Sequence, residues 1–319
     1  MSDQGRAILF VLVAVVCGTL NDVGIKLLSG DYPLHQTVFF RSVVALSVCL
    51  VFLWREGGLV LLRTDRPGLH MLRAGLVMLS NMLFFAGLAV MPLAAATALF
   101  FVAPLFITLM AIPVLGEPVG RYRLTAIGVG LAGVAVMMAP GVDWGEIGRV
   151  SLFLPLAAAA CYSGMQVLTR KLGARSAASA MAVYIQACFL LVSLAVFAVA
   201  GDGRFAQGAT HPSVIFLLRA WVWPAPEDLP VFGMIGVMSA MIGYFMGLAY
   251  RLGRASVVAS YEYAALPLAI FWGWTVFGEV PRPAVWLGIA LIAGAGLYVF
   301  ARERAQGRAL ASARPVRRD

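Results

Sequence analysis

Charged residues are scarce in this chain. Asp, Glu, Lys and Arg make up only 12% of its 319 residues, against about 25% in ordinary soluble domains. Hydrophobic residues make up 61%, and the mean hydropathy is +0.90. A soluble domain of this size needs far more polar surface than so few charges supply. The composition therefore excludes a water-soluble globular protein and predicts an integral membrane protein.

Motifs for metal, nucleotide or covalent chemistry are missing as well. No Cys-x-x-Cys or Cys/His spacing occurs, and no phosphate-binding loop ending in Gly-Lys-Ser/Thr argues for an ATP-driven pump. The three histidines suggest no Ser/His/Asp arrangement. We therefore predict no catalytic residues, no metal and no cofactor. The cysteines and histidines concerned are Cys17, Cys49, Cys161, Cys188, His35, His70 and His211.

The net charge of +9 does not indicate nucleic-acid binding, because the basic residues lie between apolar runs and form no patch interleaved with aromatics. With a cytoplasmic N-terminus, 18 of the 24 lysines and arginines fall on the cytoplasmic side. Cytoplasmic loops of membrane proteins carry such an excess. We therefore expect both termini in the cytoplasm, an even number of spans, and a basic cytoplasmic tail over residues 302–319.

Apolar runs long enough to cross the membrane recur along the chain, since about 20 residues span the hydrocarbon core. In the predicted outer loop 201–228, the apolar stretch 213–223 is too short to span. Trp221 and Trp223 favour the membrane interface, so we expect an interfacial or re-entrant helix there; a gating lid is the alternative. The ten predicted spans are 7–28, 36–54, 72–91, 94–115, 122–140, 150–169, 178–200, 229–250, 254–277 and 283–301.

The chain repeats itself. Residues 12–26 align with 156–170 at an offset of 144, and Gly116-Glu117 aligns with Gly278-Glu279 at an offset of 162. We therefore predict two similar halves, 1–141 and 148–301, of five spans each. An odd number of spans inverts the second copy in the membrane, and such repeats place substrate sites near the midplane, where rocking of the halves gives alternating access.

Two features resemble the drug/metabolite transporter superfamily, in its ten-helix EamA-type branch. One is a pair of proline-containing helices that end in Gly-Glu, each followed by a glycine-rich helix: Pro104 to Gly116-Glu117, and Pro267 to Gly278-Glu279. The other is a polar first helix followed by Arg41 early in the second. The resemblance covers about residues 6–301. It implies a secondary transporter of a small organic compound, without nucleotide hydrolysis, and specifies no substrate.

The glycine-rich run Gly128-x-Gly130-x-x-Gly133 also has the spacing of a dinucleotide fingerprint. That fingerprint needs a preceding strand and a βαβ unit, whereas this run falls in the middle of a predicted span. We interpret it as small residues that let two helices approach closely.

Four charged residues lie within predicted spans: Asp22, Lys26, Arg41 and Glu262. A charge at the bilayer centre costs about 2.5–3.5 kcal/mol on insertion scales, so each needs a reason. Lys26 lies near the outer end, where its side chain can extend to the interface. Arg41 could pair with Asp22, or hold an anionic group of a substrate. Its counterpart in the second half is Gln186.

Glu262 is the strongest single candidate for chemistry, because it lies near the middle of the ninth span between Tyr261 and Tyr263. One hypothesis makes it a proton-coupling group or the binder of a cationic substrate. The other makes it a protonated glutamate held by a tyrosine hydroxyl.

Further polar residues near mid-span predict a polar cavity with aromatic walls, although each could equally join neighbouring helices. Glu117 and Glu279 terminate helices at opposite faces and are expected, with Pro104 and Pro267, to act in structure or gating. The other expected substrate contacts are Asn21, Asn81, Gln166, Gln186, Tyr162 and Tyr244.

The sequence thus predicts an all-α polytopic transporter of the bacterial inner membrane, whose partners are a small molecule, the lipid bilayer and, in one hypothesis, protons. Our first hypothesis is export or exchange of an amino-acid-like or amphipathic metabolite. Uptake of a vitamin or nucleoside-like cofactor is the nearest alternative, and a passive metabolite channel is an alternative of another class. Oligomeric state, direction and coupling ion are not predicted.

Overall fold

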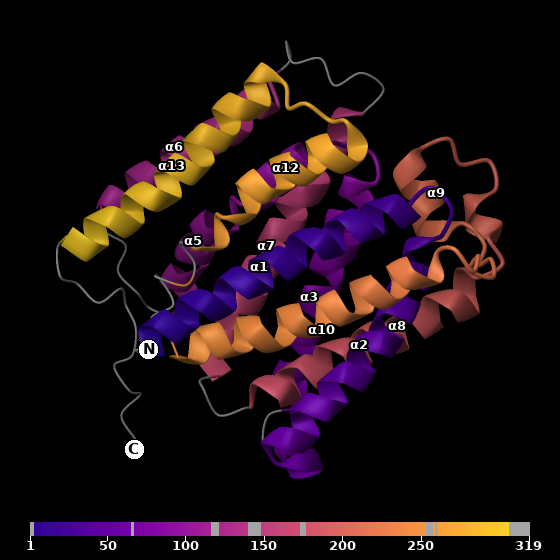
Figure 1. The fold of residues 1–319 in the computed structure, drawn as a ribbon. Helices are drawn as coiled ribbons and strands as arrows, with labels where there is room; N and C mark the ends of the chain where they lie inside the picture. The colour runs from indigo at the N-terminus through magenta and orange to yellow at the C-terminus, as the bar shows by residue number, and fades with distance from the viewer. Residues whose placement is uncertain are drawn as a thin grey trace.

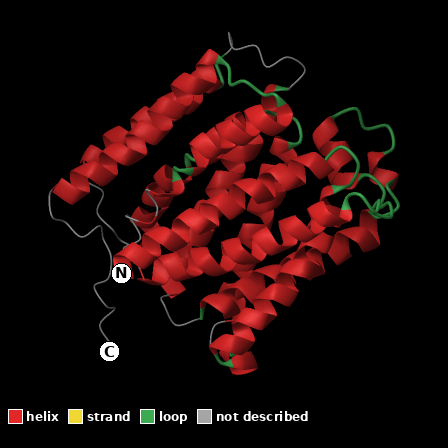
Figure 2. Cartoon of the chain, viewed as in Figure 1, coloured by secondary structure: helices red, strands yellow, loops and turns green. Residues whose placement is uncertain are grey.

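A computed structural model describes residues 3–64, 67–115, 121–139, 148–172, 177–252, 258 and 261–305. Throughout these ranges the regular secondary structure is helical, and no strand occurs in them (Figure 2). Five of the described helices are long and apolar enough to cross a membrane, and five shorter apolar helices accompany them. The predicted all-α, polytopic fold is confirmed.

The described helices divide between the two predicted halves. Those of the first half are α1 (Asp3–Leu28), α2 (Leu34–Glu56), α3 (Pro67–Leu88), α4 (Leu93–Phe100), α5 (Ala103–Leu115) and α6 (Arg121–Met137). Those of the second are α7 (Phe153–Leu172), α8 (Ala178–Ala200), α9 (Pro212–Leu218), α10 (Leu229–Leu252), α12 (Ala265–Phe277) and α13 (Pro283–Ala305). Short 3-10 turns precede or follow some of them: η1 (Gly58–Leu62), η2 (Arg149–Leu152) and η3 (Arg204–Ala206).

Helices pack across the two halves in matched pairs. Helix α1 packs against α10, and α7 packs against α3; α2 packs against α8, and α6 against α13 (Figure 1). Exchanging each helix for its counterpart in the other half reproduces the same set of contacts. Two inverted copies related by a pseudo-twofold axis would pack in this way. The half boundaries 1–141 and 148–301 stay a prediction.

The fourth span of each half is interrupted near its middle. Helix α4 ends at Phe100, a turn at 101–102 follows, and α5 begins at Ala103. In the second half, a turn at 263–264 precedes α12. The offset between the two turns is again 162. Pro104 and Pro267 therefore lie in the first turn of a new helix, where a missing N–H costs nothing, and not in the interior of a continuous helix as the sequence suggested.

The glycine-rich helices α6 and α13 run side by side at one edge of the fold (Figure 1). A Cβ atom on Gly133 would lie 3.0 Å from the carbonyl oxygen of Gly288, and one on Gly130 would collide with the Leu105 side chain. Gly128, in contrast, has nothing within 4 Å. The prediction of close helix packing is confirmed for two of the three glycines, and it is wrong for Gly128.

The outer loop differs from our expectation. Within the apolar stretch only the seven-residue segment Pro212–Leu218 is α-helical, and this short α9 packs on α2 and α3 at the end of the fold where α1 ends (Figure 1). Phe216 in α9 is 1% exposed. The helix is shorter than predicted, and Val222 and Trp223 farther along the stretch are 49% and 91% exposed. Its interfacial or re-entrant placement stays a prediction. Two predictions lie outside the described residues: Glu117 and most of the tail 302–319.

Candidate functional site

Arg41 is the largest fully buried side chain of the described residues, with 2% of its surface exposed. It projects from α2, and its guanidinium carbon lies 4.9 Å from the ring centre of Phe189 on α8 and 5.7 Å from that of Phe85 on α3. Attraction between the cation and these aromatic faces offsets part of its desolvation. The Nε and Nη2 atoms are buried and have no hydrogen-bond partner.

Asp22 and Asn21, on α1, face the same region. Asp22 interacts electrostatically with Arg41 and accepts a hydrogen bond from Asn21 Nδ2 at 3.3 Å. No ion pair within 4.0 Å joins Asp22 to Arg41 in the described part of the chain. Asn21 Oδ1 is buried without a partner. The simple structural salt bridge considered from the sequence is therefore not formed.

Gln186, the counterpart of Arg41 in the second half, lies on α8 one turn before Phe189. Its Nε2 atom donates to Ser239 Oγ on α10 at 3.0 Å, while its Oε1 atom is buried without a partner. Arg41 lies against Phe189, three residues after Gln186, and a Cβ on Gly236, three residues before Ser239, would lie 3.0 Å from the Arg41 carbonyl oxygen. We therefore group Arg41 with Gln186 and Ser239. We call Asn21, Asp22, Arg41, Gln186 and Ser239 the Arg41 cluster.

A second group of candidates surrounds the two interrupted helices. The rings of Phe101 and Tyr263, one in each turn, lie 5.5 Å apart, so the two interruptions meet. Tyr162 on α7 lies 5.3 Å from the Phe100 ring and accepts a hydrogen bond from Gln166 Nε2 at 2.6 Å. Aromatic side chains and the two turns thus meet at one place.

Glu262 is the charged residue of this second group. It is half-buried and interacts electrostatically with Tyr162 and Tyr263. The Tyr263 hydroxyl has no hydrogen-bond partner, so it is not the hydroxyl that holds Glu262. Tyr261 is 36% exposed.

Two predicted substrate contacts, Asn81 and Tyr244, make other contacts in the structure. Asn81 donates to the Val77 carbonyl at 3.1 Å within α3, one turn before Phe85 on the same face. Tyr244 stacks on Phe52 with ring centres 4.4 Å apart. These contacts fit a role in packing.

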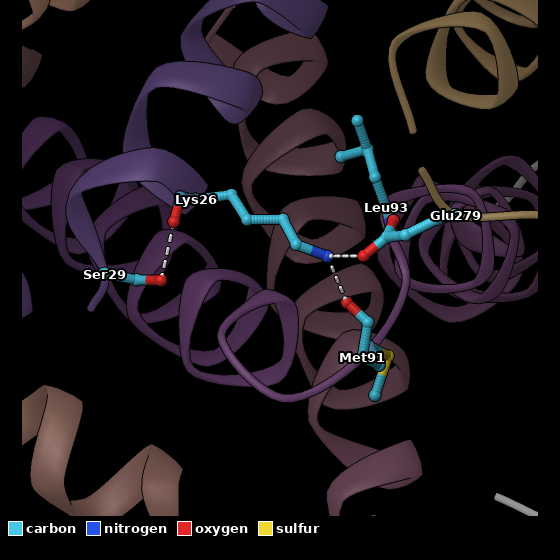
Figure 3. A network of polar contacts seen from close by, with 5 residues as sticks. All are labelled: Lys26, Ser29, Met91, Leu93 and Glu279. Atoms are coloured by element: carbon cyan, nitrogen blue, oxygen red, sulfur yellow. Dashed lines mark hydrogen bonds and ion pairs between the residues drawn. The ribbon is translucent and has the colours of Figure 1, made fainter. Parts of the chain in front are cut away.

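Lys26 forms a polar network with other parts of the protein, which the sequence did not predict; its distance from the membrane interface stays a prediction. Its Nζ atom lies 2.5 Å from Glu279 Oε1 and donates to the Met91 carbonyl at 2.8 Å (Figure 3). Glu279 Oε2 accepts from the Leu93 backbone N–H at 2.8 Å. The ring of Phe277 lies 5.0 Å from Nζ. This network joins α1, the α3–α4 turn and the end of α12.

The loop 201–228 is fastened to the turn between α1 and α2. Tyr32 donates to Asp228 at 2.6 Å and accepts from the Ala225 N–H at 2.9 Å. Burial and this hydrogen bond to Asp228 raise the pKa of Tyr32, so the hydroxyl keeps its proton as a donor. Trp221 packs on Phe197, with ring centres 4.3 Å apart. The loop therefore closes this end of the helix bundle, and Trp221 is part of the closure.

The chain matches known proteins along most of its length. The model of the EamA-like transporter family matches residues 5–139. A riboflavin transporter of Rhizobium johnstonii is 30% identical over 306 residues, which cover 95% of this chain and 93% of the relative. The chain belongs to the EamA-like transporter family. It is accordingly an integral membrane protein of the drug/metabolite transporter superfamily.

Other relatives of this transporter carry related names. A riboflavin transporter of Vibrio cholerae is 30% identical, covering 82% of this chain and 80% of the relative. An S-adenosylmethionine uptake transporter of Rickettsia prowazekii is 25% identical, covering 94% of each chain. A crystal structure of a protein with 19% identity superposes with a TM-score of 0.67 and covers 96% of this chain and all of the other, which supports the fold alone.

Sequence reasoning missed three residues of the Arg41 cluster and its walls: Phe85, Phe189 and Ser239. Each lies in an apolar run in which one phenylalanine or serine looks like any other. Only helical spacing from the predicted polar residues could have indicated the two phenylalanines. Phe85 follows Asn81 by one turn, and Phe189 follows Gln186 by three residues.

Proposed function

We propose that this transporter takes up a vitamin or nucleoside-like cofactor with a flat nitrogen heterocycle, and that a flavin is its first candidate substrate. Its relatives from Rhizobium and Vibrio are named riboflavin transporters, and those from Rickettsia are named S-adenosylmethionine uptake transporters. Both compounds join a flat heterocycle to a hydroxylated carbon chain or ring. The names favour uptake of such a compound over our first hypothesis, export of an amino-acid-like metabolite.

The observation that carries this proposal is the Arg41 cluster. Buried polar atoms without partners cost free energy, about 1–3 kcal/mol for each group. A transporter accepts such a cost where a substrate will later supply the missing hydrogen bonds. The rings of Phe85 and Phe189 beside Arg41 suit a flat heterocycle, since aromatic rings prefer offset stacked or edge-to-face contacts.

Alternating access is the proposed mechanism. The halves would rock about the cluster, with both termini in the cytoplasm and the protein in the bacterial inner membrane. The outer end would close through two structures: the Lys26–Glu279 ion pair and the loop that Tyr32 fastens through Asp228. Release of these contacts would admit substrate from outside.

Coupling to protons is a second part of the proposal. Glu262 lies at an interrupted helix, and the titratable groups that face it are Tyr162 and Tyr263. A carboxyl group in this position can exchange one proton in each transport cycle. Glu262→Gln should abolish the dependence of uptake on an imposed pH gradient while riboflavin binding persists. Normal gradient-driven uptake by this variant would end the coupling proposal.

Riboflavin uptake into proteoliposomes tests the function. We expect saturable uptake that unlabelled riboflavin on the opposite side accelerates, because counterflow requires a carrier. An excess of amphipathic amino acids should not compete. Uptake that is linear in concentration and shows no counterflow would favour a channel, and saturable uptake of an amphipathic amino acid without any riboflavin uptake would restore the first hypothesis.

A further inference from the structure

The free edge of the Arg41 guanidinium has a defined shape. Its guanidinium carbon lies 4.9 Å from the ring centre of Phe189 and 5.7 Å from that of Phe85, whereas Nε and Nη2 are buried without partners. These two nitrogens share one edge of the planar group and point two N–H bonds in parallel. Such a fork fits two acceptor atoms held side by side. The edge therefore specifies a ligand with a pair of adjacent acceptors.

Two amide oxygens complement the fork. The side-chain nitrogen of Gln186 donates a hydrogen bond to Ser239, and that of Asn21 donates to Asp22. In each case the oxygen remains buried without a donor. The site thus offers two parallel donors from Arg41 and an acceptor from Gln186, which match a ligand edge of two acceptors followed by an N–H; Asn21 Oδ1 is a further acceptor on the α1 side.

Few ring systems have this edge. In a flavin, ring nitrogen N5 and carbonyl O4 are adjacent acceptors, and N3–H follows them. Guanine and pterin rings have the same order, and arginine reads N7 and O6 of guanine in this bidentate way. Adenine presents an acceptor beside an amino donor, which would oppose an N–H of the fork. Uracil has its acceptors on either side of the N–H.

We propose that Arg41, Gln186 and Asn21 form a subsite that recognises the edge of an oxo-substituted fused heterocycle. The ring nitrogen and the neighbouring carbonyl accept from Arg41 Nε and Nη2, and the next ring N–H donates to Gln186 Oε1. Asn21 Oδ1 is the acceptor on the α1 side. The subsite gives the proposed function its substrate class and rests on it: flavin, pterin or guanine rings are accepted, and adenine is rejected.

A ligand with one atom changed tests the fork. In 5-deazariboflavin a C–H replaces N5, which removes one acceptor and leaves the ring shape intact. We expect the purified full-length protein in nanodiscs to bind it about 5- to 150-fold more weakly than riboflavin, the discrimination that a bidentate pair gives. In Arg41→Lys, which keeps the charge and loses the fork, the two ligands should bind within about twofold of each other.

The matched control is Arg73→Lys. Arg73 is a second buried arginine, 6% exposed, whose Nε also lacks a partner, and it lies near the start of α3 outside the cluster. This variant should keep the full preference for riboflavin over 5-deazariboflavin. An Arg41→Lys variant that also keeps the full preference would overturn the fork assignment.

The acceptor is tested in the same way with N3-methylriboflavin, which lacks the ring N–H. The parent should bind it more weakly than riboflavin, and Gln186→Met should bind both alike. This second pair of measurements remains decisive if an Arg41 variant fails to fold. An unchanged preference for riboflavin over the N3-methyl compound in Gln186→Met would overturn the role of Gln186.

Failure of the function and failure of the subsite give different results. If guanosine or a pterin stabilises the protein against heat and riboflavin does not, the flavin proposal fails and the subsite stands. If adenosine or an amino acid stabilises the protein and none of riboflavin, guanosine and the pterin does, the subsite proposal is overturned as well. Ligands stabilise the state that they bind, so a thermal shift reports each case.

Discussion

Glu279→Gln should loosen the outer end of the transporter. The carboxylate lies 2.5 Å from Lys26 Nζ, and the two side chains are only 22% and 13% exposed. Removing one partner of a buried ion pair costs about 3–5 kcal/mol, because the other charge stays buried without compensation. Met91 still accepts from Lys26, so we take the lower end, about 3 kcal/mol. If the pair exists only while the outer end is closed, the equilibrium shifts toward the open state by about 150-fold.

The assay is labelling of a reporter cysteine by a membrane-impermeant thiol reagent. Thr97→Cys, in a background without the native cysteines, puts the reporter on α4, one turn inward of Leu93 and 5% exposed. Glu279→Gln should raise the labelling rate strongly. Combining Lys26→Met with Glu279→Gln should bring the labelling rate most of the way back to that of the parent, since both buried charges are then gone.

The matched control is Glu227→Gln, which neutralises an exposed carboxylate in the outer loop and should leave the labelling rate of the reporter unchanged. Equal rates in the parent and in Glu279→Gln would refute the reasoning, because the ion pair would then contribute nothing to closure. Equal acceleration by the double variant would show that the carboxylate acts without Lys26.

Two further predictions concern packing. Trp221→Ala should destabilise the loop closure, by less than the about 3–5 kcal/mol of a fully buried aromatic because Trp221 is half-buried, and lower the midpoint of thermal unfolding. Trp223→Ala, at a 91% exposed position, should change stability by about 0.5 kcal/mol or less. Gly133→Leu should separate α6 from α13 and lower the yield of folded, monodisperse protein, because its Cβ alone would lie 2.9 Å from Leu291 Cβ. Gly128→Leu, where space is open, should be tolerated, and equal loss in both variants would contradict the packing account.

Local sequence signals predicted most of the fold. Apolar run lengths located the spans, since hydrocarbon thickness fixes how many residues a helix needs. The shared offset of Pro104 and Pro267 marked the two interrupted helices, although the sequence did not distinguish a kink from a break. The glycine run predicted a close helix contact but did not identify Gly128 as the outward-facing member, because which glycines face the partner depends on the rotation of the helix.

Long-range pairing could not be predicted. Lys26 and Glu279 are 253 residues apart, and only the packing of α12 beside α1 brings them together. The position of Lys26 near the end of its predicted span suggested that its ammonium group reaches water. That position contains no information about an ion-pair partner elsewhere in the chain. The contacts of Trp221 in the loop 201–228 could not be predicted for the same reason. The sequence suggested an anchor at the membrane interface, and the structure places Trp221 against rings from α2 and α8.

The pseudo-twofold symmetry explains why the polar chemistry is carried once. Under the offset of 144, Gln186 on α8 lies one residue from the position that corresponds to Arg41 on α2, and the two helices pack on each other. Two arginines there would repel by about 4 kcal/mol at a separation of 4 Å and an effective dielectric constant of 20. Glu262 likewise corresponds to Phe100, so one carboxylate serves both interrupted helices. The proposed binding of a single polar ligand between the halves requires such an asymmetry.

The same symmetry gives a last prediction, for the inner end. By the offsets 144 and 162, Lys26 corresponds to Arg170 and Glu279 to Glu117; Glu117 and the Arg170 side chain lie outside what the structure describes. An inverted repeat puts corresponding positions at opposite faces, so the sequence alone predicts an inner ion pair that competes with the outer one. Glu117→Gln should then favour the inward-open state and reduce outer labelling of the reporter, opposite to Glu279→Gln. The same direction of change in both variants would rule out a pair of alternating closures.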